Sequence, residues 1–147
     1  MQSRSRAVVV IVEPDADNRE MYSEYLRLQR LLPVPVSSAR DALIAAPTAD
    51  VLVTGTYLPG TIDGFELITR LRSAKATERI PIILLTAAGC HTERERAVAA
   101  QCDAFLLKPC VPDVLVSEIH RVVSEHRAPT ELFVPADLGS RPRRGVR

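Results

Sequence analysis

The sequence predicts an α/β fold in which five parallel strands alternate with five helices. Short apolar runs recur along the chain, and each is followed by a loop and then by a segment whose apolar residues have helical spacing. Connections of this length suit crossover helices between parallel strands and are too long for hairpin turns. Right-handed crossovers place helices on both faces of the sheet. The prediction is therefore a (βα)5 three-layer sandwich.

Length, composition and charge indicate one ordinary globular domain. The chain has 147 residues, of which 46% are hydrophobic and 25% charged. The formal net charge is +1 with the two signs mixed, so we expect no nucleic-acid or membrane partner. The apolar run at 7–12 is too short for a signal peptide or a membrane span. We expect a cytoplasmic domain over residues 7–127 and a flexible tail, rich in proline and arginine, over 128–147.

The first strand and helix follow from local signals. Residues 7–12 form a continuous and mostly β-branched run, which is typical of a strand buried on both faces. Asp17 and Glu20 lie three residues apart and resemble a capping box. Apolar residues then continue at helical spacing, so this helix is predicted to end near Arg30.

The second strand, 33–36, contains two prolines. Proline cannot donate to a ladder, so this strand is expected at an edge of the sheet. Ser37 or Ser38 can cap the next helix, which is predicted over 39–46. Pro47 then ends the helix.

The third and fourth units repeat the pattern. The third strand is predicted over 51–54, and Asp63 with Glu66 caps a helix that begins near Phe65. The fourth strand, 81–86, is apolar almost throughout.

The last two helices enclose a short strand. Thr92 is expected to cap a charged helix that ends near Gln101. The fifth strand is predicted over 104–107, and the last helix begins near Pro112. In parallel sheets the carboxyl ends of the strands form the edge that binds ligands. The residues at those ends are Glu13-Pro14-Asp15, Ser37, Gly55-Thr56-Tyr57, Thr86-Ala87 and Lys108-Pro109.

Several segments, in this order, resemble the receiver domain of two-component response regulators over about residues 7–127. They are Asp17-Asn18-Arg19-Glu20, Leu58-Pro59-Gly60, Asp63-Gly64-Phe65-Glu66, Pro81-Ile82-Ile83-Leu84-Leu85-Thr86-Ala87 and Asp103-Ala104-Phe105-Leu106-Leu107-Lys108-Pro109. The resemblance implies a flavodoxin-like sheet with strand order 2-1-3-4-5. It also implies that a histidine kinase transfers a phosphoryl group to an aspartate ending the third strand. In that family an acidic pair holds Mg²⁺, and a threonine and a lysine bind the phosphoryl oxygens.

Only part of the family's site is matched. Thr86 and Lys108 match the two residues that bind phosphoryl oxygens, and Phe105 matches the aromatic switch position. The acidic pair after the first strand is instead Glu13-Pro14, so Glu13 and Asp15 offer at most a weak metal site. If Lys108 leans into the pocket, Glu13 is its expected counter-charge.

The phosphoacceptor is the clearest departure from the family. The position four residues before Pro59 is Gly55, which has no side chain to phosphorylate. Between residues 48 and 64 the only aspartates are Asp50, before the strand, and Asp63, the expected helix cap. We therefore predict a pseudo-receiver with no phosphoacceptor and no catalytic residue.

This pseudo-receiver is expected to act through protein–protein contacts and not as an enzyme. We expect no cofactor and weak or absent Mg²⁺ binding. The resemblance implies a histidine kinase or an output protein as partner, or a homodimer through the fourth helix, fifth strand and fifth helix. The residues of the vestigial pocket are Glu13, Asp15, Gly55, Thr86 and Lys108.

Three other functions remain open from the sequence. An ordinary phosphoacceptor would need a carboxylate at Gly55, and a sensor of anions, nucleotides or other small ligands could use the vacated pocket. A redox or metal sensor could use Cys90, His91 and Cys110, which are expected in loops at the same edge of the sheet. A position near a helix N-terminus would lower the pKa of the Cys110 thiol, whereas a half-buried thiol would be inert. Cys102 carries no motif spacing.

Overall fold

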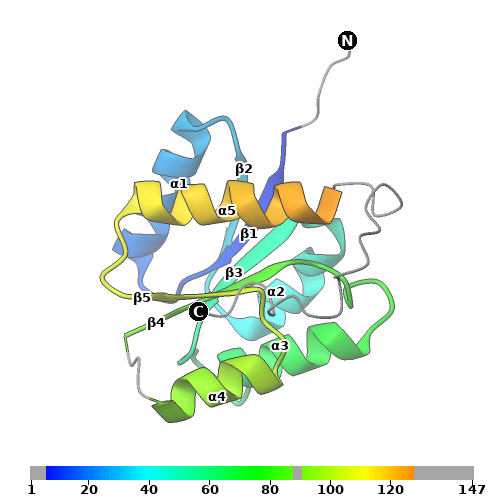
Figure 1. The fold of residues 1–147 in the computed structure, drawn as a ribbon. Helices are drawn as coiled ribbons and strands as arrows, with labels where there is room; N and C mark the ends of the chain where they lie inside the picture. The colour runs from blue at the N-terminus through cyan, green and yellow to red at the C-terminus, as the bar shows by residue number, and fades with distance from the viewer. Residues whose placement is uncertain (1–5, 88–90, 128–147) are drawn as a thin grey trace.

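The computed structural model describes residues 6–87 and 91–127, which form a five-stranded parallel sheet between two layers of helices (Figure 1). The strand order is β2-β1-β3-β4-β5, as predicted. The elements in chain order are β1 (Val8–Val12), α1 (Ala16–Leu28), β2 (Leu32–Val36), α2 (Ala39–Ala45), the 3-10 helix η1 (Ala46–Thr48), β3 (Val51–Gly55), α3 (Gly64–Ser73), β4 (Ile82–Thr86), α4 (His91–Ala99), β5 (Ala104–Leu107) and α5 (Pro112–Arg127).

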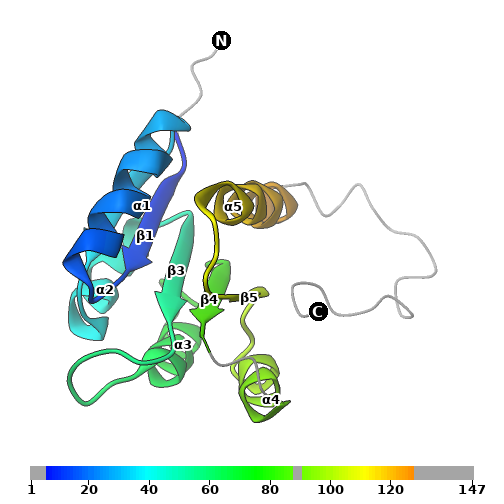
Figure 2. The same cartoon turned by 90° about the vertical axis from the view of Figure 1, so that its left-hand side faces the viewer.

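Each face of the sheet carries its own apolar cluster, because successive strand residues point to opposite faces. Val10 and Leu52 pack with α2, α3 and α4. Val9 and Ile11 pack with α1 and α5 on the other face. Figure 2 shows α5 on one side of the sheet, with α3 and α4 on the other. The interior of the domain is thus two cores separated by one buried sheet.

The predicted edge strand and two of the predicted helix caps are confirmed. β2 lies at one edge of the sheet, as its two prolines predict. The Ser38 hydroxyl accepts the Asp41 N–H at 3.2 Å, and the Asp63 carboxylate accepts the Glu66 N–H at 2.9 Å. These are the helix caps expected for α2 and α3.

Two predicted caps are wrong. The N-cap of α1 is Asp15, whose carboxylate accepts the Asn18 N–H at 2.9 Å, and Asp17 lies inside the first turn. Extended backbone at Asp15 allows this capping geometry, and the helix begins directly after it. α4 already contains His91, so Thr92 is a residue of the helix and not its cap.

No helix within the described ranges combines the length and the hydropathy that a membrane span requires. Cys90 and the predicted tail over 128–147 lie outside the described residues.

Candidate functional site

Four neighbouring strands bring most of the predicted pocket residues to one edge of the sheet. Glu13 follows β1, Gly55 ends β3, Thr86 ends β4 and Lys108 follows β5. Because these strands are adjacent and parallel, their carboxyl ends share that edge. The Lys108 N–H donates to the Thr86 carbonyl oxygen at 2.8 Å. The residues that end or follow these strands therefore lie next to one another at this edge.

Lys108 and Glu13 form the expected ion pair. The Lys108 Nζ atom lies 3.6 Å from Glu13 Oε1, and the two side chains are 34% and 8% exposed. The other oxygen, Glu13 Oε2, accepts the Asp15 N–H at 2.9 Å. Burial of the carboxylate is thus compensated by a cation and a backbone donor. This pair neutralises the lysine that the family resemblance assigns to phosphoryl oxygens.

Replacing Glu13 by glutamine is expected to lower the free energy of unfolding by about 1–3 kcal/mol, because the Lys108 ammonium loses its charged partner. Urea denaturation measures the change. The matched control is Glu24→Gln, since the Glu24 carboxylate meets Arg27 at 4.0 Å on the exposed side of α1. A Glu13→Gln effect within about half a kcal/mol of that control would mean that Lys108 is simply solvated.

Gly55 ends β3 and Gly64 begins α3, and the two glycines have different roles. A Cβ atom built on Gly55 would lie 3.5 Å from the Leu85 carbonyl oxygen, which is ordinary van der Waals contact. A Cβ atom on Gly64 would instead overlap the Gly55 carbonyl oxygen. The Gly64 N–H also donates to the Thr56 carbonyl oxygen at 2.7 Å. The close approach of α3 to β3 therefore requires glycine at 64 but not at 55.

Glu93 occupies the site, although sequence reasoning missed it. Its carboxylate comes from the first turn of α4 and is buried, at 7% exposure. The Thr86 and Thr56 hydroxyls donate to Glu93 Oε1 at 3.1 Å and 3.4 Å, respectively. Both threonines are buried. A carboxylate from α4 thus bridges the ends of β3 and β4 beside Gly55.

The sequence contained one signal for this position. Glu93 and Ala97 lie four residues apart, which places them on one helical face, and both are buried. A first-turn acid on the inward stripe of a short helix is the pattern that would have identified Glu93.

The aspartates near the site have other partners. The Asp15 side chain is exposed and caps α1, so it does not join the group around Thr86. The Asp50 carboxylate accepts the Val8 N–H at 2.7 Å, at the amino ends of β1 and β3. Asp63 caps α3. Within the described residues, no group of three or more His, Cys, Asp or Glu side chains is placed to hold a metal ion.

Phe105, at the predicted switch position, is buried on β5. The Arg94 guanidinium carbon of α4 lies 5.0 Å from the centroid of this ring. The guanidinium carbon of Arg96, on the same helix, lies 4.1 Å from the Phe65 ring centroid on α3. Cation–π contacts of this kind favour the docked position of α4 against β5 and α3.

The thiols do not form a reactive pair among the described residues. Burial raises the pKa of the half-buried Cys110 thiol, and the nearby Asp113 carboxylate raises it further. The lowered pKa considered for Cys110 is therefore wrong, because desolvation outweighs any effect of the following helix N-terminus. Burial also raises the pKa of Cys102 to about 12.

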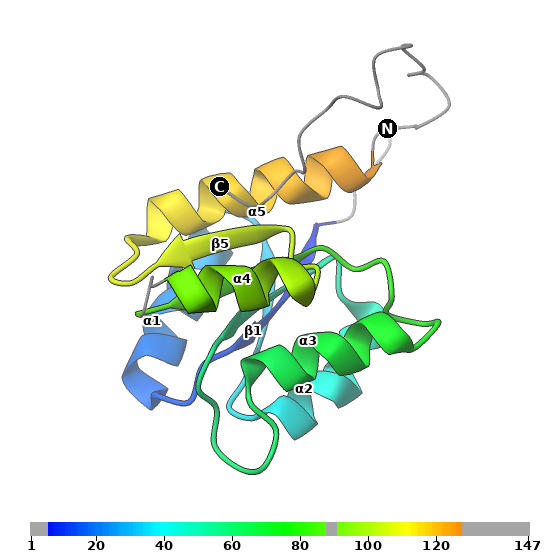
Figure 3. The same ribbon diagram turned by 60° about the horizontal axis from the view of Figure 1, so that its bottom comes forward.

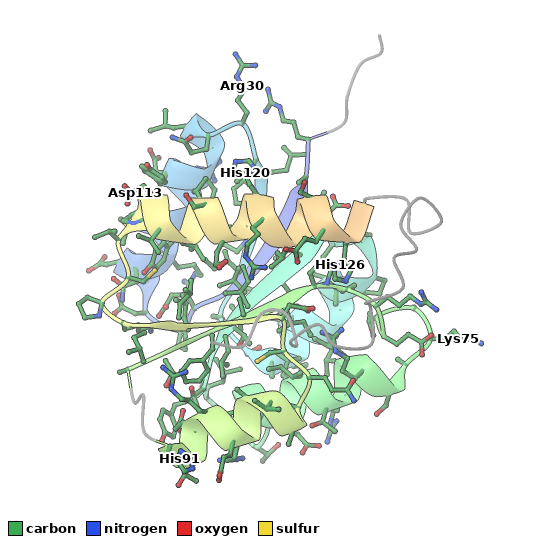
Figure 4. All side chains as sticks on the ribbon, in the orientation of Figure 1. Arg30, Lys75, His91, Asp113, His120 and His126 are labelled. Carbon is green, nitrogen blue, oxygen red and sulfur yellow. The ribbon has the colours of Figure 1, made fainter. Side chains whose placement is uncertain are left out.

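His91 does not lie in a loop, contrary to the sequence prediction. It is the first residue of α4 and lies at the amino-terminal end of that helix (Figure 4). Its Nε2 atom lies 2.9 Å from Glu95 Oε2, and both side chains are exposed. Cys90, the other member of the proposed cysteine and histidine group, lies outside the described residues.

The family assignment follows from comparison with known proteins. A family model described as the response regulator receiver domain matches residues 9–120. The chain belongs to this family. The strand order and the Thr86 and Lys108 positions agree with the assignment. Two-component signalling is therefore the setting of this receiver domain.

Curated relatives are longer than this receiver domain. The phosphate regulon transcriptional regulatory protein PhoB of Escherichia coli is 30% identical over 117 residues, which cover 78% of this chain and 51% of the relative. PhoB of Rhizobium meliloti is 41% identical over 70 residues, which cover 48% of this chain and 30% of the relative. The chain spans about half the length, or less, of these relatives.

Solved structures match the receiver domain almost completely. A putative response regulator from Chloroflexus aurantiacus is 30% identical with a TM-score of 0.75, and the match covers 82% of this chain and 99% of that one. The chemotaxis response regulator CheY4 of Vibrio cholerae is 25% identical with a TM-score of 0.74, over 80% and 99% of the two chains.

Proposed function

We propose that this receiver domain signals through protein–protein contacts and carries no aspartyl phosphate at the end of β3. The observation that carries the proposal is Gly55, which ends β3 without a side chain. Phosphoryl transfer to protein needs a nucleophile such as a carboxylate. The strand end that would supply the nucleophile in this family instead supplies only backbone.

The charges around Gly55 also support a phosphate-independent role. The Lys108 ammonium already meets the Glu13 carboxylate, and Glu93 is already held by Thr86 and Thr56. Mg²⁺ prefers several oxygen ligands in octahedral geometry. Pro14 offers no side-chain ligand after Glu13, and the Asp15 carboxylate caps α1. This donor set does not fit Mg²⁺ well, which supports weak or absent binding.

The contact face that we propose comprises α4, β5 and α5, which lie side by side in Figure 3. It displays exposed apolar side chains from all three segments and the loop between β5 and α5. Those side chains are Val98, Leu107, Val111 and Val114. Exposed apolar side chains on neighbouring elements favour a protein partner. A second copy of this chain is the partner that we propose, with a histidine kinase or an output protein as alternatives.

The direct chemical test is incubation with acetyl phosphate and Mg²⁺. We expect the intact mass to stay unchanged, because Gly55 provides no acceptor and the donor set favours no metal. Mass spectrometry before and after incubation measures this. An acid-stable or base-labile gain of one phosphoryl group, mapped within residues 1–127, would contradict the proposed function.

Self-association through the proposed face is tested with Val114→Glu. We expect the wild-type chain to dimerise with rising concentration and the variant to remain monomeric, because a charge introduced into an apolar contact must be desolvated. Sedimentation equilibrium measures both. The matched control is Ile44→Glu, which alters an exposed apolar residue on α2 and should leave the dimer intact. Wild-type chain that is monomeric throughout, or equal loss in both variants, would exclude this homodimer.

A further inference from the structure

The attachment of α4 depends on few apolar contacts. Only two of its residues, Glu93 and Ala97, are buried within the described part of the helix. Most of its other side chains are charged or exposed. A helix of nine residues has little intrinsic stability in water, so its docking must come from contacts with neighbouring elements.

Polar side chains supply much of this docking. Glu93 Oε1 accepts hydrogen bonds from the hydroxyl groups at the ends of β3 and β4, at 3.4 Å and 3.1 Å. The Arg94 guanidinium stacks over the Phe105 ring of β5, and the Arg96 guanidinium stacks over the Phe65 ring of α3. Three side chains near the start of α4 therefore contact four different elements. Glu93 is the only one of the three that is buried.

A buried carboxylate is costly unless donors compensate for the lost water. Two hydroxyl donors converge on one oxygen of Glu93. The first turn of a helix adds a favourable potential for a negative charge. These features make a specific position for a carboxylate that reaches across from α4.

We propose that Glu93 is a built-in anionic ligand that fastens α4 across the ends of β3 and β4. In this role Glu93 is a positioning residue for the face formed by α4, β5 and α5. The inference rests on the proposed function, since it concerns how that face is held without a phosphoryl group. Loss of the Glu93 carboxylate would loosen α4 and would leave intact the apolar core that lies under α1 and α5.

Amide hydrogen exchange of the full chain, followed by NMR, tests the proposal. In Glu93→Ala we expect the amides over 95–99 to exchange at least about tenfold faster, because local opening of α4 becomes easier. Amides of α1 report global opening and provide the internal reference. The matched control is Glu95→Ala, which removes an exposed carboxylate from the same helix and should change α4 exchange less than about twofold.

A second variant separates the carboxylate from its hydroxyl partner. If Glu93 acts through Thr86, adding Thr86→Val to Glu93→Ala should accelerate α4 exchange no further, because the contact is already lost. If Glu93→Ala fails to fold, Glu93→Gln replaces it and should give a smaller acceleration, because an amide oxygen still accepts the hydroxyl protons. Equal α4 exchange in the Glu93 and Glu95 variants, measured relative to α1, would overturn the proposal.

The outcome is independent of the phosphorylation test. Phosphoryl uptake by the wild-type chain would overturn the proposed function and would not change the α4 exchange rates measured without phosphate donor. Unchanged α4 exchange would overturn the role of Glu93 and would leave the phosphorylation result standing.

Discussion

Replacing Arg72 by alanine is expected to destabilise the domain by about 3–5 kcal/mol, because it leaves a largely buried carboxylate without its charged partner. Arg72 Nη2 lies 2.9 Å from Asp103 Oδ2, and the two side chains are 14% and 21% exposed. The same guanidinium donates to the carbonyl oxygens of Glu78, Ile80 and Gln101. One side chain thus connects α3 to the segments that precede β4 and β5.

Urea denaturation of Arg72→Ala measures this loss. The matched control is Arg70→Ala, two residues earlier on α3. Arg70 pairs with Glu66 at 3.0 Å, but both side chains are about half exposed, so we expect a change of about 0–1 kcal/mol. Similar values for the two variants would mean that the buried position of Arg72 adds nothing.

Replacing Gly64 by alanine is expected to cost about 3 kcal/mol, at the upper end of the range for overpacking. The added methyl group would overlap the Gly55 carbonyl oxygen and would lie 3.0 Å from the Thr56 Cα atom. Both obstacles are backbone, which cannot move aside as a flexible side chain can. Separation of α3 from the end of β3 is the expected structural result.

Gly55→Ala is the matched control for this substitution. Its methyl group would meet only ordinary contact at 3.5 Å, and alanine restricts the unfolded chain more than glycine does. We expect a change between neutral and about 1 kcal/mol of stabilisation. Thermal or urea denaturation of both variants measures the difference, and equal destabilisation would show that the contact between β3 and α3 is constrained at both glycines.

The elements that the sequence predicted well depend on local chemistry. Alternating apolar runs and helical segments led to the parallel sheet, and the prolines of 33–36 led to its edge. Glu13 and Lys108 were paired because each follows a strand at the same edge of the sheet. Strand ends are fixed by topology, so their neighbours can be inferred before any side chain is placed.

The parts that the sequence did not predict depend on how separate elements meet. Glu93 lies 37 positions from Thr56, and Arg72 lies 31 positions from Asp103. Whether such side chains meet depends on the rotation and height of α3 and α4 above the sheet. The α1 cap was missed for a local reason, since Asp15 and Asp17 are chemically equivalent candidates two residues apart.

The prolines of β2 also determine which backbone donors the outer edge of the sheet offers to another strand. The Leu32 N–H donates inward to the Ala7 carbonyl oxygen. Because successive amides of a strand point in opposite directions, Pro33 and Pro35 occupy the outward-facing positions. The outer margin of β2 therefore lacks amide donors at both places where an incoming strand would need them. This margin is therefore a poor template for an incoming strand, which disfavours domain swapping and fibril growth through β2.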